Sequence, residues 1–533
     1  MSQRDRYSRV ASLLLTTLVT LGVTGCVTDR AGSPAPHASK PQSLHPVMNP
    51  VIPGDTADPS VIRVGDDYWA TATSSEWAPH FPLFHSKDLV SWEQVGAVFQ
   101  SAPEWTEANY WAPELLEDQG RFFVYYTARK KGGPLCVGVA TASRPQGPYA
   151  DHGPLVCDPD GSIDGALVRD EGGEPYLVWK QDGNSHGAPT PIWAQRLTED
   201  RTRLAEGSTR QQLIVNDVPW EGGVVEGAYL LKRDGWFYMF YAGGGCCGRT
   251  CSYGEGVARS RKLLSGWEKN PANPLLRTSK DWTCPGHGSV VTDTSGQSYL
   301  LYHAYDARDT VYVGRQSVLD PLSWGEDGWP SFNAQRSTGG GKRAPTGFSD
   351  EFNGASVALG WQWPRGNLPQ TSVANGMLTL APAAHRATEP TGAVLARSTY
   401  TGQYVAVTAL DTTGLTPGTQ AGLSAFGDPE NALGIRVKGN TLEVWSRQGN
   451  TERTLGSAPL PEGKRLYLRM TAREGHLFRF AVGTDGTQWL DVGDEVNGDF
   501  LPPWDRGVRV ALTAGGTAGA SARFDSLSIV PRT

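Results

Sequence analysis

The sequence predicts an all-β protein, a five-bladed β-propeller followed by a β-sandwich, and three observations carry that prediction. A glycine followed by an aromatic-rich segment recurs five times, at Gly65, Gly120, Gly173, Gly235 and Gly296. Each segment is rich in Tyr, Phe, Trp and Val, as the strands of β-hairpins are. No segment sustains a 3.6-residue apolar period, which disfavours a helical solenoid. Repeats of this length built from strands alone are typical of propeller blades.

The first 46 residues predict export and a tether. Residues 1–26 combine three early arginines with an apolar run that is short for a transmembrane helix, and they end in Gly25-Cys26. This segment resembles the signal and lipobox of bacterial lipoproteins, which implies lipidation of Cys26; an ordinary signal peptide is the alternative. Residues 27–46 are rich in Pro, Ser and Ala and predict a flexible tether. We therefore expect a chain anchored by lipid to a bacterial membrane, in the periplasm or at the cell surface.

A glycine-rich break divides the remainder. Residues 47–336 hold the propeller repeats, residues 337–345 form the linker, and residues 346–533 begin a new series of short alternating strands such as Met377–Leu380. Strands at that spacing predict a β-sandwich of the concanavalin-like kind. Because the break is rich in glycine, we expect the two parts to fold separately.

Charge and cysteine content narrow the class of protein further. The net charge is −7 and no long basic run exists, so nucleic acid is not an expected partner. Apart from Cys26 the chain has an even set of cysteines, namely Cys136, Cys157, Cys246, Cys247, Cys251 and Cys284. Export permits disulfides among them, and their pairing stays open. Zinc is the weaker alternative, because no C-x-x-C spacing or adjacent histidine accompanies the cluster.

Ionisable residues precede every repeat glycine. They are Asp58, Glu114, Asp164, Glu226 and His287. The first strand of each blade lines the central channel, so these side chains are predicted to gather around one axis. Clustered carboxylates repel one another and lose hydration, which is tolerable mainly where shifted pKa values are used in catalysis.

The local sequences around these residues, in this order, resemble glycoside hydrolase family 43, which contains arabinanases, arabinofuranosidases and β-xylosidases. They are Ala57-Asp58-Pro59, Pro113-Glu114-Leu115, Ile163-Asp164-Gly165, Val225-Glu226-Gly227 and Gly286-His287-Gly288. Many members have proline where Gly165 stands. The resemblance covers roughly residues 48–335.

The resemblance implies an inverting glycosidase and a role for each residue. Asp58 is expected to be the general base, Glu226 the general acid and Asp164 the carboxylate that orients the acid and raises its pKa. Arg315 is expected to hydrogen-bond the sugar, and Glu114 to anchor a strand. His287 is implied as the holder of a structural calcium at the propeller axis, mostly through waters. No cofactor is required for the chemistry.

The substrate is expected to be a plant cell-wall polysaccharide such as arabinan or arabinoxylan. Trp77, Phe81 and Trp111 are candidates for a sugar-stacking platform, although aromatic residues also fill blade cores. Arabinofuranosyl linkages are favoured, because Cys246-Cys247-Gly248-Arg249 resembles arabinan-active members. The alternatives are a β-xylosidase, a fructan- or sialic-acid-cleaving propeller, and a non-catalytic sugar-binding propeller. A non-catalytic sugar-binding propeller has no reason to keep together an acid, a base and a carboxylate that orients the acid.

Overall fold

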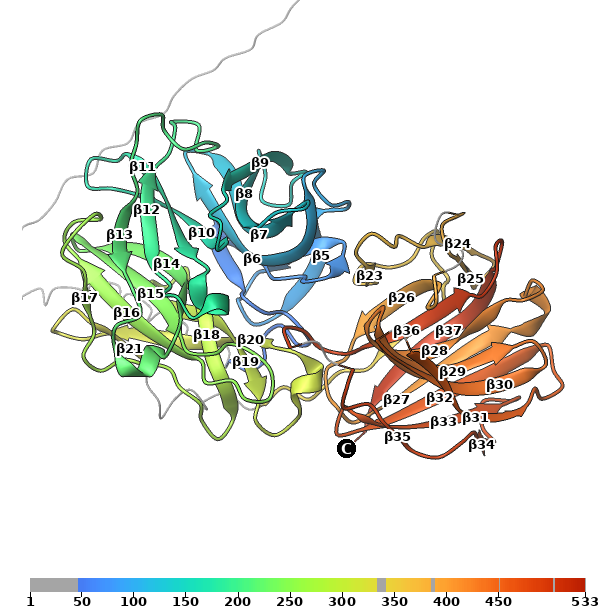
Figure 1. The fold of residues 1–533 in the computed structure, drawn as a ribbon. Coiled ribbons are helices and arrows are strands. Elements are labelled where there is room, and N and C mark those ends of the chain that lie inside the picture. The colour runs from blue at the N-terminus through green and yellow to red at the C-terminus, as the bar shows by residue number, and fades with distance from the viewer. Residues whose placement is uncertain (1–46, 333–341, 385–388, 450, 502–503, 533) are drawn as a thin grey trace, which may run out of the picture. The chain divides into compact units, whose positions relative to one another are not determined.

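The computed structural model describes residues 47–332, 342–384, 389–449, 451–501 and 504–532 (Figure 1). The predicted signal segment 1–26 with Cys26, the tether 27–46 and most of the linker 337–345 lie outside them. The described residues contain no α-helix; four 3-10 helices are Gly183–His186 (η1), Pro219–Glu221 (η2), Val311–Val313 (η3) and Thr412–Gly414 (η5). Among the described residues, no helix has the length and apolar character that crossing a membrane requires.

The described part of residues 47–332 forms five four-stranded antiparallel sheets. The first contains β1 (Ser60–Val64), β2 (Asp67–Thr71), β4 (His80–Ser86) and β5 (Trp92–Phe99). The second contains β6 (Thr106–Asp118), β7 (Arg121–Lys130), β8 (Leu135–Ala142) and β9 (Ala150–Val156). The third contains β10 (Ser162–Arg169), β11 (Pro175–Gln181), β12 (Ile192–Arg196) and β13 (Gln211–Ile214). The fourth contains β14 (Val225–Arg233), β15 (Trp236–Gly243), β16 (Gly254–Ser260) and β17 (Glu268–Lys269), and the fifth β18 (Trp282–Thr292), β19 (Ser298–Asp306), β20 (Gln316–Trp324) and β21 (Pro330–Phe332).

Apolar clusters join these sheets into a closed ring. Each cluster takes residues from two consecutive sheets, as where Val178 of the third packs with Met239 of the fourth. Four such clusters connect the first sheet through to the fifth. Another joins the fifth back to the first, with Leu301 and Leu319 beside Val61 and Tyr68. The sheets are therefore blades around a common axis, and the predicted all-β propeller is confirmed.

The segment that enters the first blade also seals the ring. Val51 N–H donates to the Ser317 carbonyl at 3.0 Å, and Thr56 N–H donates to the Arg315 carbonyl at 2.8 Å. The Asn49 side chain donates to the Leu319 carbonyl at 3.1 Å. This segment therefore runs along β20 immediately before the chain reaches Asp58.

The C-terminal part is the predicted β-sandwich, built from two antiparallel sheets that face each other (Figure 1). One sheet contains β22 (Phe348–Asp350), β24 (Gln370–Ala374), β25 (Met377–Ala381), β37 (Ala522–Pro531), β27 (Tyr404–Asp411), β32 (Arg465–Arg473), β33 (Leu477–Gly483), β34 (Leu490–Asp491) and β35 (Val496–Asn497). The other contains β26 (Ala393–Ser398), β36 (Arg509–Gly515), β28 (Gln420–Asp428), β29 (Asn431–Lys438), β30 (Thr441–Gln448) and β31 (Thr451–Pro459). The core between them is made of the inward-facing apolar residues of both sheets.

Propeller and sandwich share an interface. The Arg509 guanidinium donates to Asp55 at 2.7 Å and lies over the Trp77 ring, 4.8 Å from its centroid. Trp77 belongs to an apolar cluster made otherwise of sandwich residues. The short strands β3 (Trp77–Ala78) and β23 (Trp363–Pro364) pair across the boundary. A buried arginine held by a carboxylate and an aromatic face indicates a specific contact.

Six cysteines of the described chain form three disulfides. They join Cys136 to Cys157, Cys246 to Cys247 and Cys251 to Cys284. The expectation of disulfides is met, and the pairing that the sequence left open is now defined.

Candidate active site

At the mouth of the channel, the same backbone irregularity, a residue with positive φ, recurs in every blade. One residue within or just before each first strand has positive φ, namely Asp58 (50°), Ala112 (44°), Asp164 (57°), Gly227 (62°) and His287 (51°). In the second to fifth blades the strand pairing slips at this point. In the first blade, β1 begins just after Asp58. Such bulges turn a side chain out of the sheet, here into the channel.

A side chain from the preceding blade caps the N–H group of each bulge residue. The acceptors are His303 Nδ1 for Asp58 (3.1 Å), Thr73 Oγ1 for Ala112 (2.8 Å), Thr127 Oγ1 for Asp164 (3.0 Å), Asp164 Oδ2 for Gly227 (2.9 Å) and Glu255 Oε2 for His287 (2.8 Å). Buried N–H groups that are freed from the ladder need such partners. The ring of caps therefore couples every bulge to its neighbour.

The five ionisable residues were expected at equivalent positions of their blades, and their positions relative to the bulge correct that expectation. Asp58, Asp164 and His287 occupy the bulge position, whereas its occupants in the other two blades are Ala112 and Gly227. Glu226 precedes the bulge residue of its blade by one position, so its side chain comes from a different point of the strand. Glu114 follows Ala112 by two positions, because the strand slips there, and it lies deeper along the axis.

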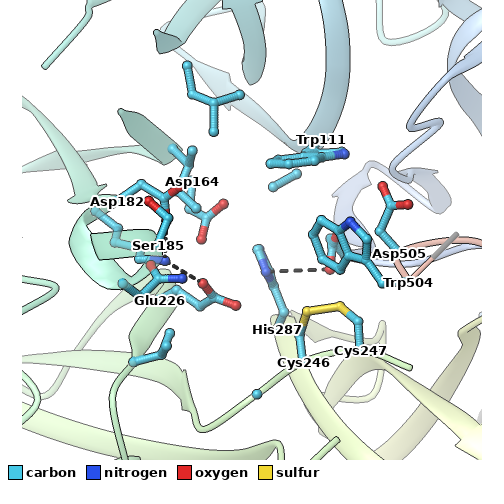
Figure 2. A pocket seen from close by; sticks show the side chains of 18 of the residues that line it. Trp111, Asp164, Asp182, Ser185, Glu226, Cys246, Cys247, His287, Trp504 and Asp505 are labelled. Carbon is cyan, nitrogen blue, oxygen red and sulfur yellow. Dashed lines mark hydrogen bonds and ion pairs between the residues drawn. A yellow bond between two sulfur atoms is a disulfide. The ribbon is translucent and has the colours of Figure 1, made fainter. Parts of the chain in front are cut away.

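Asp58, Asp164 and Glu226 line one pocket with a cavity of about 700 Å³. His287 and Arg315 line the same pocket. In Figure 2, Asp164 and Glu226 stand on one side, Trp504 and Asp505 on the other, and His287 between them. The structure therefore brings together the predicted catalytic residues.

Asp58 is fixed as an anion. Arg315 donates to its Oδ1 at 3.1 Å and Thr73 donates to its Oδ2 at 2.6 Å. Burial alone would raise the pKa of Asp58, but the charge of Arg315 and the neighbouring His287 and His303 hold it well below its usual value. Burial also lowers the pKa of His303 to about 4, so its neutral ring can accept the Asp58 N–H. This carboxylate is therefore ionised at any ordinary pH, which is the charge state that a general base requires.

Asp164 and Glu226 form an electrostatic pair. Burial and the nearby charge of Glu226 together raise the pKa of Asp164 to about 6, although His287 and Lys180 act in the opposite direction. Burial acts on Glu226 in the same direction, but the Lys180 ammonium at 2.7 Å and the Tyr253 hydroxyl at 2.8 Å lower its pKa. The pair therefore holds one proton below about pH 6, mainly on Asp164.

His287 does not lie in a metal-binding cluster. Its Nδ1 is 3.6 Å from Asp58 Oδ1, and the described residues contain no group of three or more His, Cys, Asp or Glu that could hold a metal ion. Beneath it, a cavity of about 10 Å³, lined in part by Glu114, has room for about one water. Burial raises the pKa of Glu114 to about 7, in keeping with its expected structural place.

The predicted aromatic platform is only partly at the pocket. Trp111 lines it. Trp77 is buried against the sandwich, as described above, and Phe81 is fully buried in the core between the first two blades beside Tyr110 and Tyr126. These two expectations are corrected: both side chains fill cores, because they lie on β3 and β4 and not on the first strand of the blade.

The structure adds residues that the sequence did not single out. Trp504 and Asp505 reach the pocket from the sandwich: Trp504 is 60% exposed and packs edge-on against Trp111, and the Asp505 carbonyl accepts from Arg315 at 3.2 Å. No sequence motif predicts Trp504 and Asp505 as pocket residues, because they lie far from the propeller motifs in the sequence. Lys180 could have been noticed, because a lysine ending the apolar strand Tyr176–Trp179 is unusual and must be paired if buried.

Comparisons with known proteins agree on one family. Residues 47–330 match the family described as glycosyl hydrolases family 43, and residues 349–529 match the domain described as beta xylosidase C-terminal concanavalin A-like. A protein named xylosidase/arabinosidase from Butyrivibrio fibrisolvens is 31% identical over 300 residues, which cover 54% of this chain and 56% of that protein. The match therefore spans about half the length of that relative.

Two further relatives extend the likeness. The extracellular exo-alpha-(1->5)-L-arabinofuranosidase ArbA of Cellvibrio japonicus is 27% identical over 52% of this chain and 86% of its own length. The crystal structure of the GH43 BlXynB protein from Bacillus licheniformis superposes with a TM-score of 0.77 at 26% identity. That superposition covers 92% of this chain and all of the other.

Proposed function

Because the chain belongs to glycoside hydrolase family 43, we propose that it hydrolyses terminal arabinofuranosyl or xylosyl linkages of plant cell-wall polysaccharides with inversion. The observation that carries this proposal is the division of charge in the pocket. Asp58 is held ionised while Asp164 and Glu226 share a proton. Inverting hydrolysis needs one carboxylate and one carboxylic acid at the same time. Family 43 enzymes need no cofactor for catalysis, and none enters this proposal.

Each carboxyl group has one task in the proposed mechanism. Asp58 accepts a proton from the attacking water, and Arg315 and Thr73 keep it oriented. Glu226 donates a proton to the departing glycosidic oxygen. Asp164 holds the proton in the resting site and transfers it to Glu226, which then donates it, since two adjacent buried carboxylates cannot both ionise freely.

The walls of the pocket favour removal of single residues from chain ends. Trp504 and Asp505 of the sandwich border it on one side and the turn η1 on the other, where Ser185 and His186 line it. Walls on both sides suit a terminal sugar better than the middle of a chain. The arrangement therefore supports exo action.

The identity of the pentose is the finer part of the proposal. Arabinofuranosyl linkages are our first choice, supported by the resemblance around Cys246 and by the relative named an exo-arabinofuranosidase. A β-xylosidase is the second candidate, favoured by the match of residues 349–529 to a β-xylosidase C-terminal domain.

A substrate panel with a stereochemical readout tests the proposal. The purified protein is assayed on nitrophenyl α-L-arabinofuranoside, nitrophenyl β-D-xyloside, arabinan and arabinoxylan, and the first-formed sugar is followed by proton NMR. We expect release of monosaccharide with the inverted anomeric configuration. Retention of configuration would overturn the role of Asp58, and inactivity on every pentoside would overturn the substrate class.

We also propose that the protein is exported and lipid-anchored through Cys26. The pairing of the other six cysteines supports this, because disulfides persist in oxidising compartments and Cys26 is the odd cysteine. Metabolic labelling with a fatty acid should mark the wild type and not Cys26→Ala. Equal labelling of both proteins would contradict the anchor.

A further inference from the structure

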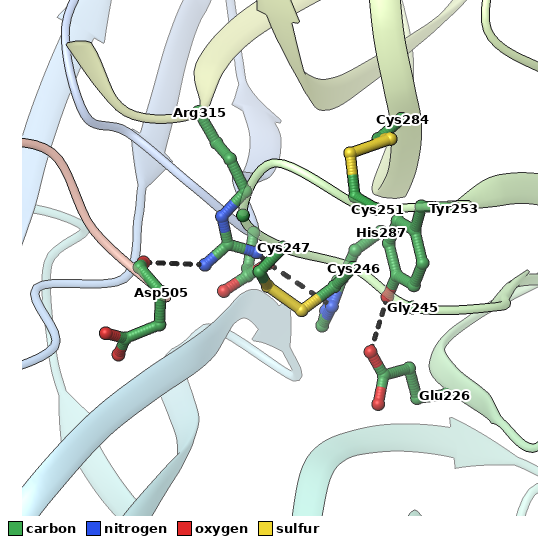
Figure 3. The surroundings of a disulfide bond; sticks show 12 residues. Glu226, Gly245, Cys246, Cys247, Cys251, Tyr253, Cys284, His287, Arg315 and Asp505 are labelled. Atoms are coloured by element: carbon green, nitrogen blue, oxygen red, sulfur yellow. Dashed lines mark hydrogen bonds and ion pairs between the residues drawn. A yellow bond between two sulfur atoms is a disulfide. The ribbon is translucent and has the colours of Figure 1, made fainter. Parts of the chain in front are cut away.

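The bond between neighbouring cysteines Cys246 and Cys247 forms part of the pocket wall. Both residues line the pocket and are partly exposed. Figure 3 shows their disulfide between Arg315 and Asp505 on one side and Glu226 with Tyr253 on the other. The proposed mechanism gives this pair of sulfur atoms no task.

A stabilising role explains this disulfide poorly. Cross-links stabilise a fold mainly by closing loops in the unfolded chain, and the effect grows with loop length. Cys136–Cys157 and Cys251–Cys284 span sequence separations of 21 and 33, whereas Cys246–Cys247 spans a separation of 1. A bond between neighbours closes almost no loop, so its value lies in the surface that it presents.

The loop that carries the disulfide is held by four attachments. The Gly244 N–H donates to the Glu221 carbonyl at 2.9 Å, and the Gly248 N–H donates to the Tyr305 hydroxyl at 3.1 Å. Arg249 binds Asp499 of the sandwich at 3.1 Å. The Cys251–Cys284 bond ties the end of the loop to β18. The sulfur atoms are therefore held in place before any ligand arrives, which lowers the cost of binding.

The chemistry of this surface complements a sugar ring. A disulfide between neighbours closes a compact ring that is apolar and polarisable and offers no strong hydrogen-bond donor. Arg315 and Asp58, which line the same pocket, are charged. A pentose presents hydroxyl groups along its edge and C–H groups on its face, so it can meet both surfaces at once.

We propose that the Cys246–Cys247 disulfide is the platform on which the C–H face of the terminal pentosyl ring rests. The proposal rests on the proposed function, because it assigns a surface to the sugar that Arg315 and Asp58 bind. The platform supplies binding in the ground state and the transition state alike. Its loss should raise KM with little change in kcat.

The test compares two disulfide deletions in the full-length protein. Cys246→Ala/Cys247→Ala should raise KM for the nitrophenyl pentoside, and the Kd of the free pentose by calorimetry, roughly tenfold. Its Tm should change little. The control, Cys136→Ala/Cys157→Ala, removes a disulfide that closes a longer loop and whose cysteines do not line the pocket. This variant should lower Tm while KM stays at the wild-type value. Unchanged KM and Kd in the first variant, or equal rises in both, would overturn the platform.

A second pair of variants separates the apolar surface from the fold of the loop. Cys246→Val/Cys247→Val keeps apolar bulk without the bond, and Cys246→Ser/Cys247→Ser replaces it with hydroxyl groups. The valine pair should bind the pentose more tightly than the serine pair, and the reverse order would overturn an apolar contact. A wild type that hydrolyses no pentoside refutes the proposed function itself, whereas an active wild type with indifferent variants refutes the platform alone.

Discussion

At the scale of the residue, Lys180 sets the protonation state of Glu226, the proposed acid. Its ammonium is almost fully buried and lies 2.7 Å from Glu226 and 2.8 Å from Asp182. A buried lysine between two carboxylates stays charged, because leaving either partner unpaired would be costly. The resting site therefore stores its proton on Asp164 and keeps Glu226 ready to receive it. The sequence motifs identified the carboxylates but do not include this cation, since Lys180 lies on a different strand.

The first prediction concerns the acid and the base. Glu226→Gln and Asp58→Asn should each lower kcat by about a hundredfold to ten-thousandfold, because each removes a proton transfer. Thermal melting should show both proteins folded. A pentoside with a good leaving group should restore Glu226→Gln but not Asp58→Asn, since only the former loses leaving-group protonation. A folded variant with a near-normal rate would remove that residue from the mechanism.

The second prediction concerns pH. The rate should fall as pH rises through about 6, where the Asp164–Glu226 pair loses its shared proton. Lys180→Met removes the charge that lowers the pKa of Glu226, so the pair should keep its proton longer and the alkaline limb of kcat/KM should move to higher pH. Asp58 titrates well below this range, so the acid limb should stay in place.

A matched lysine serves as the control for that experiment. Lys269 makes a similar ion pair with the buried Glu221 at 2.7 Å, outside the pocket. Lys269→Met should lower Tm without moving either limb of the pH profile. An alkaline limb that moves to lower pH in Lys180→Met would contradict the assigned electrostatics.

At the scale of the element, the bulge in or just before each first strand directs the side chains of the site into the channel. Strand identity could be predicted from the aromatic repeats, and so could the gathering of Asp58, Asp164 and His287 on one axis. The slip that places Ala112 rather than Glu114 at the bulge could not, because a one-residue irregularity leaves no mark on alternation. Trp77 and Phe81 were equally ambiguous, since an aromatic residue suits a core and a sugar platform alike.

The third prediction tests the bulge in the fourth blade. A Cβ atom at Gly227, where φ is 62°, would lie 2.8–3.1 Å from atoms of the His287 ring. Gly227→Ala should therefore cost about 1–3 kcal/mol of stability and lower kcat, by straining the backbone and displacing His287. Gly296 also has positive φ but nothing within 4 Å of the added Cβ, so Gly296→Ala should cost only about 1 kcal/mol and leave kcat intact. Equal losses of stability and rate would refute a specific clash at Gly227.

At the scale of the whole molecule, the sandwich completes the pocket of the propeller. The glycine-rich linker predicted two separately folding parts, but the buried Arg509–Asp55 contact and the pairing of β3 with β23 join them. Asp55 is three residues from Asp58, so the interface borders the base. Linker composition carries no information about such contacts, because they form between residues distant in sequence.

The fourth prediction follows from this interface. Residues 47–336 alone should lose solubility or most of their activity, because Trp77 and Asp55 lose their cover and Arg315 loses the Asp505 carbonyl. In the full chain, Trp504→Ala should raise KM with little change in Tm, since that side chain is 60% exposed. Full activity of the isolated propeller, measured on the same pentoside, would show that the sandwich is dispensable.

The contact between Arg315 and the Asp505 carbonyl has a consequence for biosynthesis. A ribosome makes the catalytic carboxylates long before it reaches the residues that finish the pocket. A nascent or prematurely terminated chain therefore lacks one wall of its site even when every blade is complete. Under the proposed function, we therefore expect full activity only once the ribosome has passed Trp504 and Asp505.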